Sequence, residues 1–112
     1  MRQLLFVFTV SAIALLAQGG AAPKNLKVLK PEEVRPAMGM AVTGLGVQCT
    51  ACHVADRSSD ELPMKVTARM MFAMTQEINA KFPDGKAHVT CYTCHRGQKE
   101  PLTAAPPAAP AQ

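Results

Sequence analysis

The residues of this 112-residue chain that are best suited to chemistry are its four cysteines and the histidines that follow them. All four cysteines belong to Cys-x-x-Cys-His motifs, which read CTACH at 49–53 and CYTCH at 91–95. Four cysteines in an exported protein ordinarily indicate two disulfides, and two Cys-x-x-Cys pairs can also form a tetrahedral zinc site. Neither alternative requires a histidine directly after each pair, whereas attachment of c-type haem does.

Haem attachment gives every position of the motif a physical reason. Two thiols three residues apart on a helical turn match the two vinyl groups of one haem, and the next residue presents its imidazole to the iron. The sequence therefore predicts two covalently bound haem c groups, each held by two cysteines and one iron-ligating histidine: Cys49, Cys52 and His53 for the first, and Cys91, Cys94 and His95 for the second.

The ligand on the opposite side of each iron decides the function. A methionine there gives an electron-transfer centre with a raised potential, whereas an open iron is typical of gas binding or peroxide chemistry. Methionine is more often flexible core filler than a ligand, so position on a helix has to separate the two roles. Beyond the initiator, the candidates are Met38, Met40, Met64, Met70, Met71 and Met74.

A short helix that leads into the first motif is predicted in the segment 31–46, and one of its last two glycines is expected to end it. Pro36 would remove a backbone hydrogen bond inside this helix, so a start of the regular helix at Pro36 is the alternative. Met38 falls on the apolar face of the helix, and Met40 points roughly the opposite way. Met38 is therefore the better candidate for the first iron.

A second helix is predicted from about Pro63 to Phe82, where a Pro-Asp-Gly turn follows. Met71 lies in the middle of its apolar stripe, with Met74 beside the stripe and Met70 at the periphery. Met71 is therefore the better candidate for the second iron.

The two ends of the chain are predicted to lie outside the folded domain. Residues 1–22 contain Arg2, an apolar run and then small residues, which is typical of a secretory signal peptide; an uncleaved membrane anchor is the alternative. The Ala/Pro-rich residues 103–112 are predicted to be a disordered tail. The remaining domain, 23–102, is short enough to need a staple, and two haems would supply it.

Charge excludes one class of function and constrains the partners only weakly. The formal charge is +4, but the basic residues are scattered and the chain has one tyrosine and no tryptophan, which argues against nucleic-acid binding. Lys65, Arg69 and Glu77 are expected on a solvated helix face, with contact between Arg69 and a haem propionate as the alternative. Any steering towards a partner would depend on local patches of charge.

Three stretches of the sequence resemble the cytochrome c subunit of photosynthetic reaction centres: MGMAVTGLGVQCTACH, ARMMFAMTQEIN and VTCYTCHRGQ. The resemblance runs from Asn25 to about Pro101, and the chain is similar to a short di-haem relative, one half of the four-haem subunit. It implies an all-α fold of two helix–turn–motif units, with the haems forming much of the core. It also implies that Met38, eleven residues before Cys49, and Met71 are the sixth ligands.

The sequence thus predicts a periplasmic electron carrier rather than an enzyme. Single electrons would pass between redox proteins of the periplasm or membrane, with a membrane-bound reaction centre or a respiratory complex as a candidate partner. The alternative is a small haem enzyme or sensor with one open iron. That alternative needs a distal acid or base, and His88, the one histidine outside the motifs, is expected to lie on the surface.

Overall fold

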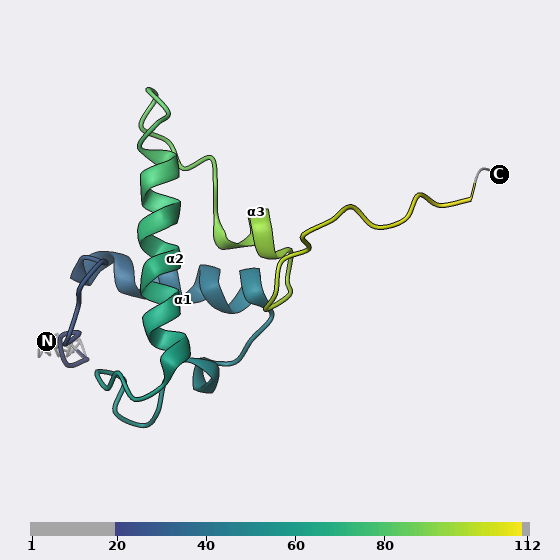
Figure 1. The fold of residues 1–112 in the computed structure, drawn as a ribbon. Helices are drawn as coiled ribbons and strands as arrows, with labels where there is room; N and C mark the ends of the chain where they lie inside the picture. The colour runs from purple at the N-terminus through teal and green to yellow at the C-terminus, as the bar shows by residue number, and fades with distance from the viewer. Residues whose placement is uncertain (1–19, 111–112) are drawn as a thin grey trace, which may run out of the picture.

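The computed structural model describes residues 20–110, and within this range the protein consists of helices and loops without any β-strand. Its elements are α1 (Pro31–Leu45), a short 3-10 helix η1 (Cys49–Ala51), α2 (Pro63–Asn79) and α3 (Cys91–His95) (Figure 1). The predicted all-α fold class is therefore confirmed. No helix within residues 20–110 combines the length and the apolar character that a membrane span requires.

Helix α1 begins at Pro31, five residues before the alternative start that Pro36 suggested. Pro31 occupies the first helical position, where a missing N–H costs nothing, and the backbone N–H of Lys30 donates to Glu33 Oε2 at 2.8 Å. A start at Pro36 is therefore wrong, because this capping outweighs the single backbone hydrogen bond that Pro36 cannot donate. The helix ends at Gly46, one of the two glycines expected to end it, whose φ of 64° lets its N–H donate to the carbonyl of Val42.

Helix α2 begins at Pro63 as predicted but ends at Asn79, three residues before the predicted end at Phe82. The Asn79 side chain explains the earlier end. Its Oδ1 accepts from the backbone N–H groups of His88 and Val89, both at 2.9 Å, and its Nδ2 donates to the carbonyl of Val89 at 2.8 Å. The chain is thereby folded back towards α3 immediately after α2.

The end of α1 packs directly on α3, which carries the second haem motif. A Cβ atom added at Gly44 would lie 2.7 Å from the Cβ of Cys91, so only glycine fits there without a shift. The N–H of Gly97 donates to the carbonyl of Gly44 at 2.8 Å. The helix of the first predicted unit thus contacts the motif of the second unit, an arrangement that a simple repeat of helix, turn and motif did not predict.

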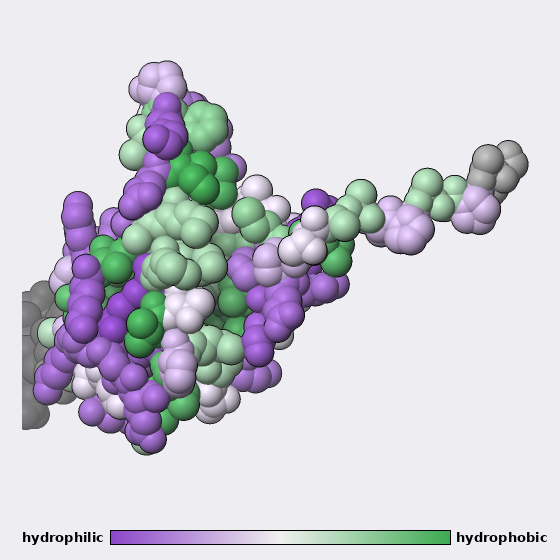
Figure 2. Space-filling view, viewed as in Figure 1, coloured by the Kyte–Doolittle hydropathy of each residue, from purple (hydrophilic) through white to green (hydrophobic). Residues whose placement is uncertain are grey.

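The polypeptide itself buries very little. Among residues 20–110, Ala37 is the one buried hydrophobic residue, and no large side chain is fully buried. Figure 2 shows hydrophobic residues lying open along α2. Ten large hydrophobic side chains are exposed: Leu26, Met40, Val42, Val66, Met70, Met71, Met74, Phe82, Tyr92 and Leu102. A domain of this length with so little core needs additional apolar bulk.

The structure describes the two predicted terminal segments to different extents. Residues 1–19 of the predicted signal peptide lie outside the described residues. Residues 102–110 are exposed and extend away from the helices without forming one (Figure 1). The predicted disorder of the tail, and the division into signal peptide, domain and tail, stay predictions.

Candidate haem sites

A cavity of about 580 Å³ lies at the first motif, and four segments enclose it. They are the residues 21–29, which we call the N-terminal strap, together with α1, the segment 52–58 and α2. This volume falls within the range of roughly 300–1,000 Å³ that is usual for cofactor-sized ligands. Met38, Cys52 and His53, three of the residues predicted to hold the first haem, all line it.

His53 has the properties of an imidazole that lacks a partner. Its Nδ1 atom is buried and has no hydrogen-bond partner among the described residues. Burial lowers the pKa of His53, and the positive charges of Lys65 and Arg57 lower it further. These effects favour the neutral imidazole, which is the form that ligates a metal. The donor set at this cavity, a thiol, a neutral imidazole and a thioether, fits haem c.

Met38 reaches the cavity from the middle of α1. Its side chain is half-buried and lines the cavity, whereas Met40 is 46% exposed and does not belong to the cavity lining. This placement agrees with the helix face inferred from the sequence. The assignment of Met38 as the sixth ligand of the first iron stays a prediction.

The second motif forms the short helix α3. At its start, the N–H of Thr90 donates to Thr93 Oγ1 at 2.9 Å, and the N–H of Thr93 donates to the carbonyl of Thr90 at 3.1 Å. His95 Nδ1 lies 3.1 Å from the carbonyl oxygen of Gln98. A hydrogen bond from Nδ1–H to that carbonyl fixes the ring and leaves Nε2 as the free nitrogen, an arrangement common for metal-ligating histidines. His95 and its neighbouring cysteines therefore fit a second haem.

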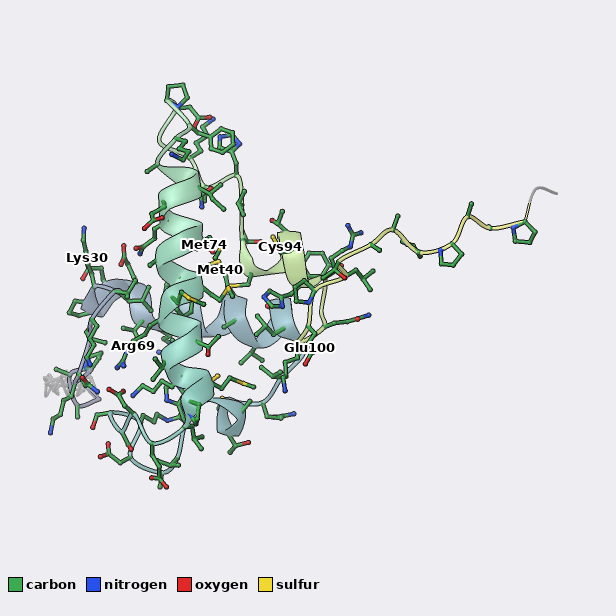
Figure 3. All side chains as sticks on the ribbon, viewed as in Figure 1. Lys30, Met40, Arg69, Met74, Cys94 and Glu100 are labelled. Atoms are coloured by element: carbon green, nitrogen blue, oxygen red, sulfur yellow. The ribbon has the colours of Figure 1, made fainter. Side chains whose placement is uncertain are left out.

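The surroundings of the second motif are more open than those of the first. Met71 is 38% exposed, Met74 is 45% exposed, and Tyr92, inside the motif itself, is 57% exposed. Figure 3 labels Met40, a residue of α1, and Met74, a residue of α2. Both side chains lie on the side of α2 that is turned towards α3 and Cys94. Met71 does not line the first cavity. Its assignment to the second iron stays a prediction.

The cysteines and the remaining histidine show no competing arrangement. All four cysteines are free of disulfides, and burial raises the pKa of the Cys52 and Cys91 thiols. Residues 20–110 contain no group of three or more Cys, His, Asp or Glu side chains placed to hold a metal ion. His88 lies in the loop after α2, with Nε2 at 2.9 Å from both carboxylate oxygens of Asp84, and its ring stacks on Phe82.

Two helix charges expected on a solvated face lie at the first cavity instead. Lys65 and Arg69 line the cavity, and their side chains are only 11% and 17% exposed. That expectation is wrong because Asp60, which sequence reasoning did not single out, supplies a carboxylate to both. An isolated aspartate in a loop carries no sequence signal of such a role. Glu77 is exposed, as expected.

Comparison with known proteins agrees with this arrangement of two motifs on a helical frame. Residues 23–105 match the family described as photosynthetic reaction centre cytochrome C subunit. The chain belongs to this family. Membership implies covalently bound haem c, and the free cysteines and the cavity at the first motif fit that group.

The similar curated proteins are much longer than this chain. The photosynthetic reaction center cytochrome c subunit of Rubrivivax gelatinosus is 42% identical over 55 residues, which are 47% of this chain and 15% of that protein. The subunit of the same name from Thermochromatium tepidum is 44% identical over 59 residues, covering 47% and 14%. Cytochrome c-554 of Chloroflexus aurantiacus is 40% identical over 57 residues, covering 46% and 14%. No solved structure matches the chain.

Proposed function

We propose that this chain is a di-haem c-type cytochrome that passes single electrons between redox partners and is not an enzyme. The observation that carries the proposal is the cavity at the first motif. There the thiol of Cys52 and the imidazole of His53, which are adjacent in the sequence, line one cavity together with the thioether of Met38 from α1. This is the donor set of a six-coordinate electron-transfer haem.

Haem c bound at this cavity would supply an iron centre that changes oxidation state by one electron. The residues of the chain set the conditions for that change. Cys49 and Cys52 would attach the group, and His53 and Met38 would ligate its iron, so that Met38 would exclude water and small ligands. A thioether ligand and an apolar wall both favour the reduced iron and therefore raise its potential.

The second haem would be attached to Cys91 and Cys94, with His95 and Met71 as its iron ligands. The contact between α1 and α3 supports a short separation between the two groups. Met38 stands in the middle of α1, and Gly44 near its end touches Cys91. One helix therefore belongs to both sites, which suits the transfer of single electrons from one haem to the other.

The partners of the proposed carrier are redox proteins, and its proposed location is the periplasm. Three of the similar proteins have names that identify them as reaction-center subunits, which supports a membrane-bound reaction centre as the oxidised partner. A respiratory complex would meet the same requirement in a host without photosynthesis. The sequence of residues 1–22 supports export, because c-type attachment takes place outside the cytoplasm.

The intact mass of the denatured, exported protein tests the proposal. We expect the mass of the mature polypeptide with two covalently added haems, and digestion should place one haem on a peptide with Cys49 and Cys52 and the other on a peptide with Cys91 and Cys94. A mass with one haem or none would refute the di-haem carrier. Alkylation of the free thiols before digestion identifies any motif that lacks its haem.

A haem enzyme or sensor is the second candidate, and the open surroundings of the second motif favour it. The methionines there are exposed, so the second iron could remain open to a small molecule. Carbon monoxide binding by the fully reduced protein separates the two functions. The carrier should bind none at either haem, whereas rapid binding at the Cys91/Cys94 haem would establish the enzyme or sensor.

A further inference from the structure

The N-terminal strap forms a whole wall of the first cavity, although no backbone–backbone hydrogen bond of the described residues holds it there. All nine of its residues, 21–29, line the cavity, and the seven from Pro23 onwards remain if the predicted signal peptide 1–22 is removed. Within residues 20–110, no backbone–backbone hydrogen bond joins the strap to the rest of the chain. The position of this wall therefore depends on side-chain contacts.

Two of the four polar contacts of the strap go to one carboxylate, that of Asp60. Asp60, in the loop before α2, lies 2.8 Å from Arg69 Nη1 and 3.3 Å from Lys65 Nζ, both on α2. On the strap, Asn25 Nδ2 donates to Asp60 Oδ1 at 3.0 Å, and Lys27 Nζ lies 3.5 Å from Oδ2. Asp60 itself does not line the cavity, but it joins the strap to α2, and both of these segments do line it.

The partners of Asp60 are also joined to each other. Arg69 Nη2 donates to the backbone carbonyl of Asn25 at 2.9 Å, and Asn25 Nδ2 donates to the carbonyl of Ser58 at 2.7 Å. Asn25 has a φ of 58°, a left-handed conformation that asparagine adopts more readily than most residues. This bend turns both the side-chain amide and the carbonyl of Asn25 towards the same cluster.

The burial of the Lys65 and Arg69 side chains explains why the carboxylate of Asp60 is needed. Their side chains are only 11% and 17% exposed, and a buried cation is costly unless it is paired. Lys65 Nζ donates to the carbonyls of Arg57 and Ser59 at 2.8 and 2.7 Å, but those groups are neutral. Hydrogen bonds, first from Arg69 and then from Asn25, hold the pKa of Asp60 well below its usual range, so it is ionised at neutral pH.

We propose that Asp60 is a positioning residue that latches the N-terminal strap over the first haem cavity and thereby limits access of water and small ligands to the first iron. The part of this inference that concerns the iron rests on the proposed function. The latch itself concerns only residues of the chain, so it can be tested separately.

Limited tryptic digestion of the native protein tests the latch. Trypsin cuts an opened strap after Lys24 and Lys27, whereas cuts after Lys65 and Arg69 require α2 to unfold. With cleavage after Lys99 as an internal reference, Asp60→Asn should accelerate strap cleavage about tenfold, as expected for an opening equilibrium that loses a charge-assisted contact. An unchanged rate, or cuts in the strap and α2 together, would count against the latch.

Two further variants make the digestion decisive. Asp84→Asn removes a carboxylate that also holds a partner, His88, but contacts no residue of the strap, so strap cleavage should stay at the wild-type rate. Asn25→Gly keeps the left-handed backbone and removes only the amide on the strap. If Asp60→Asn destabilises α2, Asn25→Gly decides the question: faster strap cleavage with an intact α2 supports the latch, and an unchanged rate overturns it.

Access to the iron is measured in a protein whose sixth ligand has been removed. In reduced Met38→Ala, addition of Asp60→Asn should raise the rate of carbon monoxide binding at the first haem about tenfold, in parallel with strap opening. Addition of Asp84→Asn should leave the rate unchanged. If haem is present on the peptide with Cys49 and Cys52 but the rate does not rise, the latch inference fails. If no haem is found there, the proposed function fails instead.

Discussion

The two Cys-x-x-Cys-His motifs have the same five-residue pattern, but the protein surrounds them differently. The first lies at a cavity with four walls, which come from the N-terminal strap, α1, the segment 52–58 and α2. The second forms α3, rests on the end of α1, and has exposed methionine and tyrosine side chains around it. The motif therefore specifies attachment, and the segments around it specify the environment of the iron.

This difference has a physical origin in the described segments that lie on either side of each motif. The first motif has the strap and α1 before it and a loop with Asp60 and α2 after it, so chain from both sides can fold over it. The second motif is followed by Arg96 and Gly97, and residues 96–110 are all exposed and form no helix that could cover it. A haem at the first site should accordingly hold four segments together, whereas a haem at the second site should contact mainly α1 and α3.

The largest effect is expected from removal of either haem. Because Ala37 is the one buried hydrophobic residue among residues 20–110, each haem should supply much of the missing core. We expect Cys49→Ala/Cys52→Ala to abolish cooperative melting, because the segments that line the cavity lose their shared contact. Cys91→Ala/Cys94→Ala should retain more helix by circular dichroism. If Cys49→Ala/Cys52→Ala retained more helix than Cys91→Ala/Cys94→Ala, the expected order of the two sites would be reversed.

The next effect is loss of a sixth ligand. Met38→Ala and Met71→Ala should each remove about half of the methionine–iron charge-transfer band, lower one potential and open one iron to carbon monoxide. Met40→Ala, Met70→Ala and Met74→Ala serve as matched controls, because these side chains are 45–55% exposed and should lose only modest packing. Carbon monoxide binding in Met74→Ala but not in Met71→Ala would move the ligand of the second site to Met74.

A smaller effect is expected from a substitution in α1, and it should be confined to the second site. Gly44→Ala would place a Cβ atom 2.7 Å from the Cβ of Cys91, and such overpacking typically costs about 1–3 kcal/mol. We expect a lower melting temperature and a changed spectrum of the second haem alone. Gly39→Ala, in the same helix with no atom within 4 Å of the added Cβ, should stabilise slightly. Equal effects of the two substitutions would show that α1 does not position α3.

Acid should act on the first site through Asp60. The folded pKa of Asp60 is held below the ordinary value of about 3.9 by Arg69, Asn25 and Lys65, so its contribution is complete above that pH. The contribution is lost as pH falls below about 4 towards the folded pKa. Strap cleavage by an acid-active protease should therefore rise with acidification in the wild-type protein and remain nearly constant in Asp60→Asn. Parallel profiles would exclude Asp60 as the titrating group.

The smallest effect is expected from the tail. Removal of residues 103–112 should leave the absorption spectrum, both potentials and the melting temperature unchanged, because an exposed Ala/Pro segment packs on nothing. A change confined to the second haem would show that the tail shields that site after all.

Several features followed from the sequence because they depend on local chemistry. The motifs at 49–53 and 91–95 predict the attachment residues, since the spacing of two thiols and an imidazole is set within one turn of chain. Helical periodicity selected Met38, which does line the first cavity, and the glycine that ends α1 was expected. Local bonding also decides helix ends: the Glu33 side chain favours the start of α1 at Pro31 over the alternative at Pro36, and the Asn79 side chain accounts for the end of α2 three residues before Phe82.

Other features were decided only by the tertiary structure, because they depend on residues far apart in the chain. Asp60 became the common partner of Asn25, Lys65 and Arg69 only when the strap and α2 came together around the cavity. Gly44 acquired its role only when α1 packed on α3. The residue types and their spacing indicate what each segment can bind. The enclosure of the cavity and the pairing of charges depend on which segments come together in the fold.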